Sequence, residues 1–311
     1  MAEKETLIDL LQATIRENWE YPAMTDFHGA SYQYRDVARK IAKIHLLYEH
    51  SGIKPGDKVA LCGRNCAQWS IAFIATITYG AVIVPILHDF KADNIHNLVR
   101  HSESRLLFVD SAIWENLDPE AMPALEGVLL INNFSLLLSR SKKLTRRTLN
   151  RIFGERYPER FTPDDVSYTP VDPDATAAIN YTSGSTGFSK GVMLSYHNFW
   201  SNIRYCIDNI PFVKRGDEAI CMLPLAHMYG LTIEMLHTFC RGCHIYFLTR
   251  TPSPKIIIDA FGAIRPKLII TVPLVIEKII KTKVFPLLDK PLMKLLLHVP
   301  FVDDRLLGRI K

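Results

Sequence analysis

A short loop rich in glycine and hydroxyl side chains is the densest chemical signal in the sequence. It runs from Tyr181 to Gly191 and reads YTSGSTGFSKG. Gly184 and Gly187 allow backbone conformations in which successive N–H groups point at one anion, and Lys190 adds a positive charge. The side chains that add hydroxyl donors are Thr182, Ser183, Ser185 and Thr186. This combination predicts a loop that binds a polyphosphate.

The loop differs from the Walker A type of phosphate loop. A Walker A loop reads G-x-x-x-x-G-K-[S/T] and opens a helix. Here Gly191 follows Lys190, and Val192-Met193-Leu194 favours a strand. The competing interpretation is a glycine- and serine-rich surface hairpin without a ligand.

The loop and several other segments resemble the AMP-forming adenylate ligases, the superfamily of acyl-CoA synthetases, luciferases and peptide-synthetase adenylation domains. Residues 174–180 (DATAAIN) match the strand that leads into this superfamily's phosphate loop, and residues 54–60 (KPGDKVA) are similar to an early strand entry. Residues 223–232 (LPLAHMYGLT) and 272–279 (VPLVIEKI) look most like long-chain fatty acyl-CoA synthetases. The resemblance covers nearly the whole chain.

The resemblance implies a two-step reaction. A fatty acid carboxylate attacks the α-phosphate of ATP, accompanied by Mg²⁺, to give acyl-adenylate and pyrophosphate; coenzyme A then takes the acyl group. The residues that carry over to phosphate binding are Thr182, Ser183, Gly184, Ser185, Thr186, Gly187 and Lys190. Lys190 and His227 carry over as catalytic residues. The Lys190 cation and the fixed donors of the loop would stabilise the charge on the departing pyrophosphate.

The resemblance also implies an acyl-binding wall. His227 would lie beside the acyl carboxylate and the α-phosphate, while Tyr229 and Leu231 would flank the acyl channel. The competing interpretations are a structural histidine and plain core packing. Ser189 stands where the superfamily usually has proline, which should leave the loop's donors in place.

Several motifs of the superfamily have no counterpart in these 311 residues. They include the segment that contacts adenine, the glutamate that holds Mg²⁺, the aspartate that binds ribose, and the C-terminal catalytic domain with its lysine. We therefore assign no metal ligand, and we expect the N-terminal part of a ligase that does not catalyse adenylation alone. The alternative is a stand-alone module that binds nucleotide or acyl groups without catalysis. Medium-chain, aryl and carrier-protein-linked acids remain alternatives to long-chain fatty acids.

Alternating apolar runs predict an α/β fold with mostly parallel sheets covered on both faces. The predicted strands are 23–27, 32–34, 58–62, 81–87, 105–110, 127–131, 175–181, 190–194, 218–223, 244–249 and 267–271, with helices between most of them. The resemblance implies two stacked, doubly wound sheets in an αβαβα arrangement, with the ligand in the crevice between them. Residues 56–205 would form one subdomain with the phosphate loop, and residues 1–55 plus 206–311 an incomplete second one.

Residues 65–88 carry no Asp, Glu, Lys or Arg, and their length would allow a membrane span. Gly80 and Pro85 interrupt the run, and Val82-Ile83-Val84 favours a strand. We therefore expect a buried helix that leads into a buried parallel strand.

A basic segment, residues 136–160, contrasts with the rest of the chain. It holds eight Lys and Arg residues against Glu155 and Glu159, within a net charge of +5. A solvated connecting helix is the favoured interpretation. The alternative is an amphipathic helix between Arg140 and Arg160 that contacts a membrane surface or an anionic ligand. An RNA-binding role ranks last because no aromatic stacking pattern accompanies the charges, so nucleic acid is not an expected partner.

The chain has six cysteines, but a chain of this size needs no disulfide framework. The N-terminus is not a secretory signal. We expect a cytoplasmic protein, with peripheral contact to the inner face of a membrane through the basic segment as an extension; the oligomeric state is open. Cys240 and Cys243, with His237 and His244 nearby, could form a zinc site, but no second matching pair exists and buried thiols are favoured.

Overall fold

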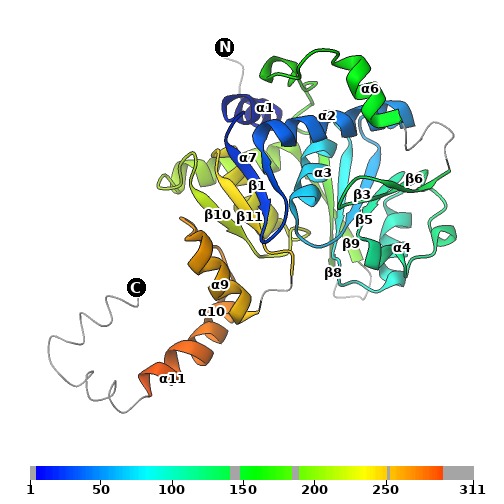
Figure 1. Ribbon diagram of the computed structural model, residues 1–311. Coiled ribbons are helices and arrows are strands. Elements are labelled where there is room, and N and C mark those ends of the chain that lie inside the picture. Colours follow the sequence, from blue (N-terminus) through cyan, green and yellow to red (C-terminus); the bar gives the residue numbers. More distant parts are fainter. Residues whose placement is uncertain (1–4, 141–147, 184–188, 251–252, 290–311) are drawn as a thin grey trace. The chain divides into compact units, whose positions relative to one another are not determined.

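A computed structural model describes residues 5–140, 148–183, 189–250 and 253–289 of the chain (Figure 1). The chain divides into two compact units. The first unit comprises residues 1–251 and 264–270, and the second comprises residues 252–263 and 271–311. Both sheets belong to the first unit, so the candidate site is described within it.

The larger sheet has seven strands in the order β7-β6-β5-β3-β4-β8-β9. These strands are β3 (Lys58–Cys62), β4 (Val82–Ile86), β5 (Leu106–Val109), β6 (Gly127–Leu130), β7 (Leu136–Ser139), β8 (Thr176–Ser183) and β9 (Ser189–Ser195). The five inner strands run parallel, while β7 and β9 run antiparallel to their neighbours at the two edges. The prediction of a mostly parallel sheet is confirmed.

Both faces of this sheet are buried under helices. Val59 and Leu61 of β3 belong to one hydrophobic cluster, and Ala60 and Cys62 belong to the other, because successive side chains of a strand point to opposite faces. Helix α3 (Ala67–Thr78) contributes to the first cluster and α4 (Ala92–His101) to the second. The doubly wound arrangement therefore follows from apolar side chains on both faces of each inner strand.

The uncharged segment forms the helix and strand expected of it. Every residue of α3 is buried, and β4 lies between β3 and β8 in the sheet interior. Among the described residues, no helix is long and apolar enough to cross a membrane. The absence of charged residues in this segment thus reflects its burial inside the protein.

The smaller sheet has four strands in the order β10-β11-β1-β2. They are β1 (Pro22–Asp26), β2 (Ser31–Gln33), β10 (Glu218–Cys221) and β11 (His244–Phe247). Strands β10, β11 and β1 are parallel, and β2 forms an antiparallel hairpin with β1. Met24 and Phe247 of this sheet share a hydrophobic cluster with Val59 of the larger sheet. The two sheets therefore contribute to one core.

Helices α1 (Leu7–Glu17), α2 (Tyr34–Ser51) and α7 (Tyr196–Asn209) also contribute to that core. Gly52 ends α2 in the left-handed conformation, and Ser195 caps α7 by accepting a hydrogen bond from the Asn198 N–H. The other helices are α5 (Ser111–Trp114), η1 (Pro119–Ala121), α6 (Thr148–Arg156), η2 (Pro163–Asp165), η3 (Gly230–His237) and α8 (Thr238–Cys240) in the first unit and, mostly in the second, α9 (Pro254–Ile264), α10 (Pro273–Ile279), η4 (Ile280–Val284) and α11 (Phe285–Leu288).

The turn at residues 54–57 fixes the start of β3. Gly56 has φ of +86°, a conformation that other residues rarely adopt. The Lys54 N–H donates to the Asp57 carboxylate at 2.8 Å. Arg105 pairs with both Asp57 and Glu126, which joins this turn to the entries of β5 and β6.

Two sequence-based expectations were wrong. Residues 267–271 form no strand, because only one bridge, between Leu268 and Ala219 of β10, links them to the sheet before the chain turns into α10. The basic segment is not one helix either. Its start pairs with β6 as β7, residues 141–147 lie outside the described part, and α6 follows.

Helix α6 packs on α2 through polar contacts. Lys43 donates to the Asn150 side chain at 2.8 Å, and Arg156 pairs with Glu49 at 3.0 Å. This docking supports the interpretation of α6 as a connecting helix. Contact of residues 140–160 with a membrane surface stays a prediction.

Candidate functional site

The phosphate-loop signature joins the two strands of an antiparallel hairpin. Strands β8 and β9 pair from Thr176–Ser195 to Ser183–Ser189, at one edge of the seven-stranded sheet. The signature residues Gly184, Ser185, Thr186 and Gly187 lie outside the described residues. The described part of the signature therefore fixes where the loop begins and ends.

Thr182 and Lys190 face one another across this hairpin and are both exposed. Directly opposed residues in an antiparallel pair place their side chains on the same face of the sheet. A hydroxyl donor and an ammonium group consequently lie together where the loop leaves the strands. This pairing suits an anion that carries several oxygen atoms.

The hairpin is anchored to α4 by Tyr181. The Tyr181 hydroxyl lies 2.7 Å from His101 Nδ1, and the two rings meet edge to face with centroids 5.6 Å apart. Burial raises the pKa of Tyr181 above its ordinary value. This contact with His101 holds the end of β8 that leads into the loop.

Asn180 connects the hairpin to the second motif of the sequence. Its buried side chain donates from Nδ2 to the Ala226 carbonyl at 2.9 Å. Ala226 directly precedes His227, whose imidazole is exposed. The structure therefore places the His227 backbone beside the strand that leads into the phosphate loop.

Residues 222–227, here called the His227 segment, are held from two further directions. Asn65 donates from Nδ2 to the Leu223 carbonyl at 2.7 Å, and the Leu225 N–H donates to Asn65 Oδ1 at 3.0 Å. Glu234 Oε2 accepts from the N–H groups of Met222 at 3.1 Å and Leu223 at 2.9 Å. Because buried side chains satisfy these backbone groups, the segment has a defined conformation.

The motif glycine allows this segment to pack closely on the helix that follows it. A Cβ atom on Gly230 would lie 3.0 Å from Leu223 Cβ and 3.2 Å from the Pro224 carbonyl oxygen. Gly230 begins η3, a π-helix, which is a rare geometry in proteins. The glycine in LPLAHMYGLT therefore has a packing reason.

The two proposed acyl-channel residues differ in exposure. Tyr229 is 52% exposed, whereas Leu231 is fully buried in the larger hydrophobic cluster. The residues Thr182, Lys190, His227 and Tyr229 are thus exposed, whereas Leu231 lies inside the core.

Asn65, Asn180 and Glu234 were not selected from the sequence. Asn65 and Asn180 bond to residues 158 and 46 positions away, which no local pattern reveals. The sequence does mark Glu234 as unusual, because it is the only acidic residue between Glu218 and Asp259 and lies in an apolar run. Burial raises its pKa to about 8, partly offset by the two N–H donors and the Cys221 thiol.

The Cys240–Cys243 pair is embedded in the fold. Cys243 is buried and its thiol donates to the Lys214 carbonyl at 3.4 Å, while burial raises its pKa to about 12. Within the described part of the chain, no group of three or more His, Cys, Asp or Glu residues could hold a metal ion.

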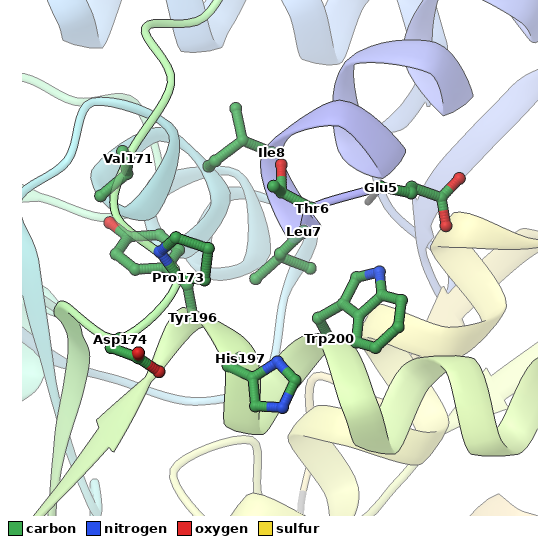
Figure 2. A pocket seen from close by; sticks show the side chains of 10 residues that line it. All are labelled: Glu5, Thr6, Leu7, Ile8, Val171, Pro173, Asp174, Tyr196, His197 and Trp200. Atoms are coloured by element: carbon green, nitrogen blue, oxygen red, sulfur yellow. The ribbon is translucent and has the colours of Figure 1, made fainter. Parts of the chain in front are cut away.

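A cavity of about 290 Å³ lies elsewhere in the first unit (Figure 2). Leu7 and Ile8 of α1, Pro173, and His197 and Trp200 of α7 are among its lining residues. Figure 2 shows these side chains around a space between the start of α1 and the start of α7. No residue of the phosphate-loop signature or the His227 segment lines it, so we do not assign it to that site.

Comparison with known proteins identifies the family. The sequence profile of the AMP-binding enzyme family matches residues 11–299. The chain belongs to the AMP-binding enzyme family. This membership agrees with the phosphate-loop signature and with the two mostly parallel sheets of the fold.

Curated relatives resemble the chain over most of its length. It is 29% identical over 289 residues to the long-chain-fatty-acid–[acyl-carrier-protein] ligase AEE15 of Arabidopsis thaliana, covering 89% of this chain and 39% of the relative. It is 25% identical over 281 residues to the long-chain-fatty-acid–CoA ligase 5 of Rattus norvegicus, covering 87% of this chain and 40% of the relative. The chain thus spans about two fifths of the length of these relatives.

Solved structures of other proteins share the fold. Apo MatB from Rhodopseudomonas palustris superposes with a TM-score of 0.71 at 19% identity, covering 90% of this chain and 52% of that protein. At this identity the likeness supports the fold alone.

Proposed function

We propose that this chain supplies the phosphate-binding side of an AMP-forming long-chain fatty acyl-CoA ligase. In the first step, a carboxylate oxygen of the fatty acid attacks the α-phosphorus of ATP, and pyrophosphate leaves with the electron pair of the broken P–O bond. In the second step, the deprotonated thiol of coenzyme A attacks the acyl carbonyl, and AMP leaves. The two steps consume ATP and release AMP and pyrophosphate.

The observation that carries this proposal is the cross-strand pair of Thr182 and Lys190 at the base of the signature loop. Negative charge grows on the β- and γ-phosphates as pyrophosphate leaves. A positioned ammonium group and hydroxyl donors stabilise that charge without reorganising during the reaction. We propose that Ser183, Gly184, Ser185, Thr186 and Gly187 complete this set of donors.

We propose that His227 contacts the reacting carboxylate. The hydrogen bond from Asn180 to Ala226 supports this role, because it holds the backbone that directly precedes exposed His227 beside the strand that carries the loop. Tyr229, which is also exposed, would contact the acyl chain, and buried Leu231 would support that wall from inside.

Mg²⁺ enters the proposal only as the companion of ATP. The described residues offer no cluster of carboxylates for a metal ion, so we assign it no protein ligand. Phosphate oxygens are ligands that Mg²⁺ prefers, and the ion would reduce the charge that the loop must neutralise.

Long-chain fatty acids are proposed on the basis of the relatives. The relatives described above are named as long-chain fatty acid ligases, one using coenzyme A and the other acyl carrier protein. Coenzyme A is the proposed thiol acceptor, and acyl carrier protein is the alternative to test beside it.

We also propose a cytoplasmic location with peripheral membrane contact through the basic segment, and a subdomain boundary near residue 205.

Carboxylate-dependent ATP–pyrophosphate exchange in the full-length protein tests the activity. We expect exchange that requires a long-chain fatty acid and falls about 100-fold or more in Lys190→Met. Exchange that ignores the fatty acid, or is unchanged in Lys190→Met, would contradict the ligase. Binding of ATP without any exchange would instead favour the alternative function, a binding module without catalysis.

A further inference from the structure

Glu234 is a buried carboxyl group that the phosphate chemistry does not use. Its side chain lies on η3 and is 1% exposed. Burying a carboxyl group costs free energy unless hydrogen bonds compensate it. An acidic side chain in the apolar run LTIEMLHTF therefore calls for a specific cause.

Its hydrogen-bond partners identify that cause. Glu234 Oε2 accepts from the N–H groups of Met222 and Leu223, at 3.1 and 2.9 Å. These residues directly follow the last residue of β10, Cys221, so the parallel ladder no longer supplies acceptors for them. The carboxyl oxygen takes the place of a strand partner at the point where the His227 segment begins.

The rest of the His227 segment is fixed from other elements. Asn65 bonds to the backbone of Leu223 and Leu225, and Asn180 bonds to Ala226. Glu234 thus constrains the start of the segment through the Met222 and Leu223 amides, Asn65 also holds Leu223, and Asn180 constrains the end. A shift at the start would move the backbone that carries His227.

We propose that Glu234 is a positioning residue that sets the place of the exposed His227 imidazole relative to the phosphate-loop hairpin. It acts through the Met222 and Leu223 amides and does not touch the substrate. This inference rests on the proposed function for its catalytic meaning. A side chain that only stabilises the fold is the alternative explanation.

Three variants separate these explanations. Glu234→Met removes the acceptor with little change in volume, whereas Glu234→Gln keeps an oxygen at the same place. Thr238→Ala is the control, because the buried Thr238 hydroxyl bonds to the Glu234 carbonyl of the same helical segment and to Met235 O at 3.2 Å. That variant weakens the helix without removing the acceptor for the His227 segment.

Amide hydrogen exchange and the NMR signals of the His227 imidazole test the proposal in the chain without substrate. In Glu234→Met we expect exchange at Met222 and Leu223 to rise about tenfold or more, with shifted His227 signals, since each amide loses its partner. Glu234→Gln should retain the wild-type pattern. Thr238→Ala should lower the melting temperature without a selective rise at these two amides. Unchanged amides and imidazole signals in Glu234→Met, or a Gln variant that behaves like Met, would overturn the proposal.

Kinetics in the full-length protein then test the catalytic meaning. We expect Glu234→Met to lower kcat for adenylation more than it raises KM for ATP, with recovery in Glu234→Gln. An active Glu234→Met enzyme with wild-type kcat would overturn the positioning role. If the wild-type protein shows no fatty acid-dependent exchange, the proposed function fails, while the amide and imidazole measurements still decide whether Glu234 positions His227.

Discussion

The side chain of Asn180 and the carbonyl of Ala226 are joined by a buried hydrogen bond of 2.9 Å. Asn180 lies on the strand that enters the phosphate loop, and Ala226 precedes His227. Two motifs that are 46 residues apart in the chain thus share one direct contact. The contact gives the two halves of the candidate site a fixed relation.

Asn180→Ala should destabilise the protein by about 1–3 kcal/mol, because it leaves the buried Ala226 carbonyl without its donor. Asn209→Ala is the matched control, since Asn209 makes the same kind of bond, to the Tyr205 carbonyl at 2.9 Å, on an exposed helix surface. Urea denaturation measures both variants. Equal losses in the two variants would show that the Asn180 contact has no special weight.

Gly230→Ala should also destabilise the protein, by about 1–3 kcal/mol, because its Cβ would press on Leu223 and on the Pro224 carbonyl. Gly154→Ala is the opposite case. Its Cβ would meet open space in α6, where alanine favours a helix by about 0.5–1 kcal/mol. Thermal denaturation should therefore give shifts of opposite sign, and a neutral Gly230→Ala would contradict the close packing.

The raised pKa of Glu234 makes stability depend on pH. The folded-state pKa of about 8 lies above the ordinary value of 4.5, so the folded protein keeps a proton that the unfolded chain releases between these values. Stability from this group is present at low pH and is lost as pH rises toward 8. The slope approaches about 1.4 kcal/mol per pH unit.

Glu234→Gln removes this titration. The free energy of unfolding of wild type minus that of Glu234→Gln should fall steadily from pH 5 to pH 8, as measured by denaturation in a series of buffers. A difference that stays constant over this range would show that the carboxyl group does not keep its proton in the folded state.

His45 should make stability depend on pH in the opposite direction, so that the protein loses stability as pH falls. Burial lowers its pKa from 6.5 to about 4, and His45 Nε2 must donate to the Ala75 carbonyl, 2.9 Å away. The unfolded chain therefore binds a proton first, and stability is lost as pH falls from 6.5 toward 4. His45→Gln keeps a donor without titrating, so it should lose less stability than wild type between pH 7 and pH 4.5. Identical pH profiles would contradict the neutral, buried imidazole.

Much of the fold could be predicted because inner parallel strands are buried on both faces. Short apolar runs such as VALC in β3 and VIVPI in β4 leave few other structures for those residues. The prediction failed where pairing decides the outcome. Residues 267–271 have a strand-like sequence but only one bridge, whereas LLLS in β7 lies in a basic segment yet pairs with β6 at three positions.

The candidate site could be predicted in part for a related reason. Signature residues such as Lys190 are close in sequence, so their spacing is visible in the chain. The side chains that hold the His227 segment are not, because Asn65 and Asn180 act over long separations in sequence. Exposure also had to come from the structure, which separates Tyr229 on the surface from Leu231 in the core.

Titration of the chain with Mg·ATP and with pyrophosphate tests the central claim most directly. We predict that both ligands bind to wild type and to Lys214→Met, which removes an exposed lysine from another part of the surface. Lys190→Met should weaken both ligands about tenfold or more, because a charge-assisted contact to phosphate is lost. Equal affinity in Lys190→Met and Lys214→Met, or no binding of either ligand to wild type, would contradict a phosphate-binding role for the β8–β9 hairpin.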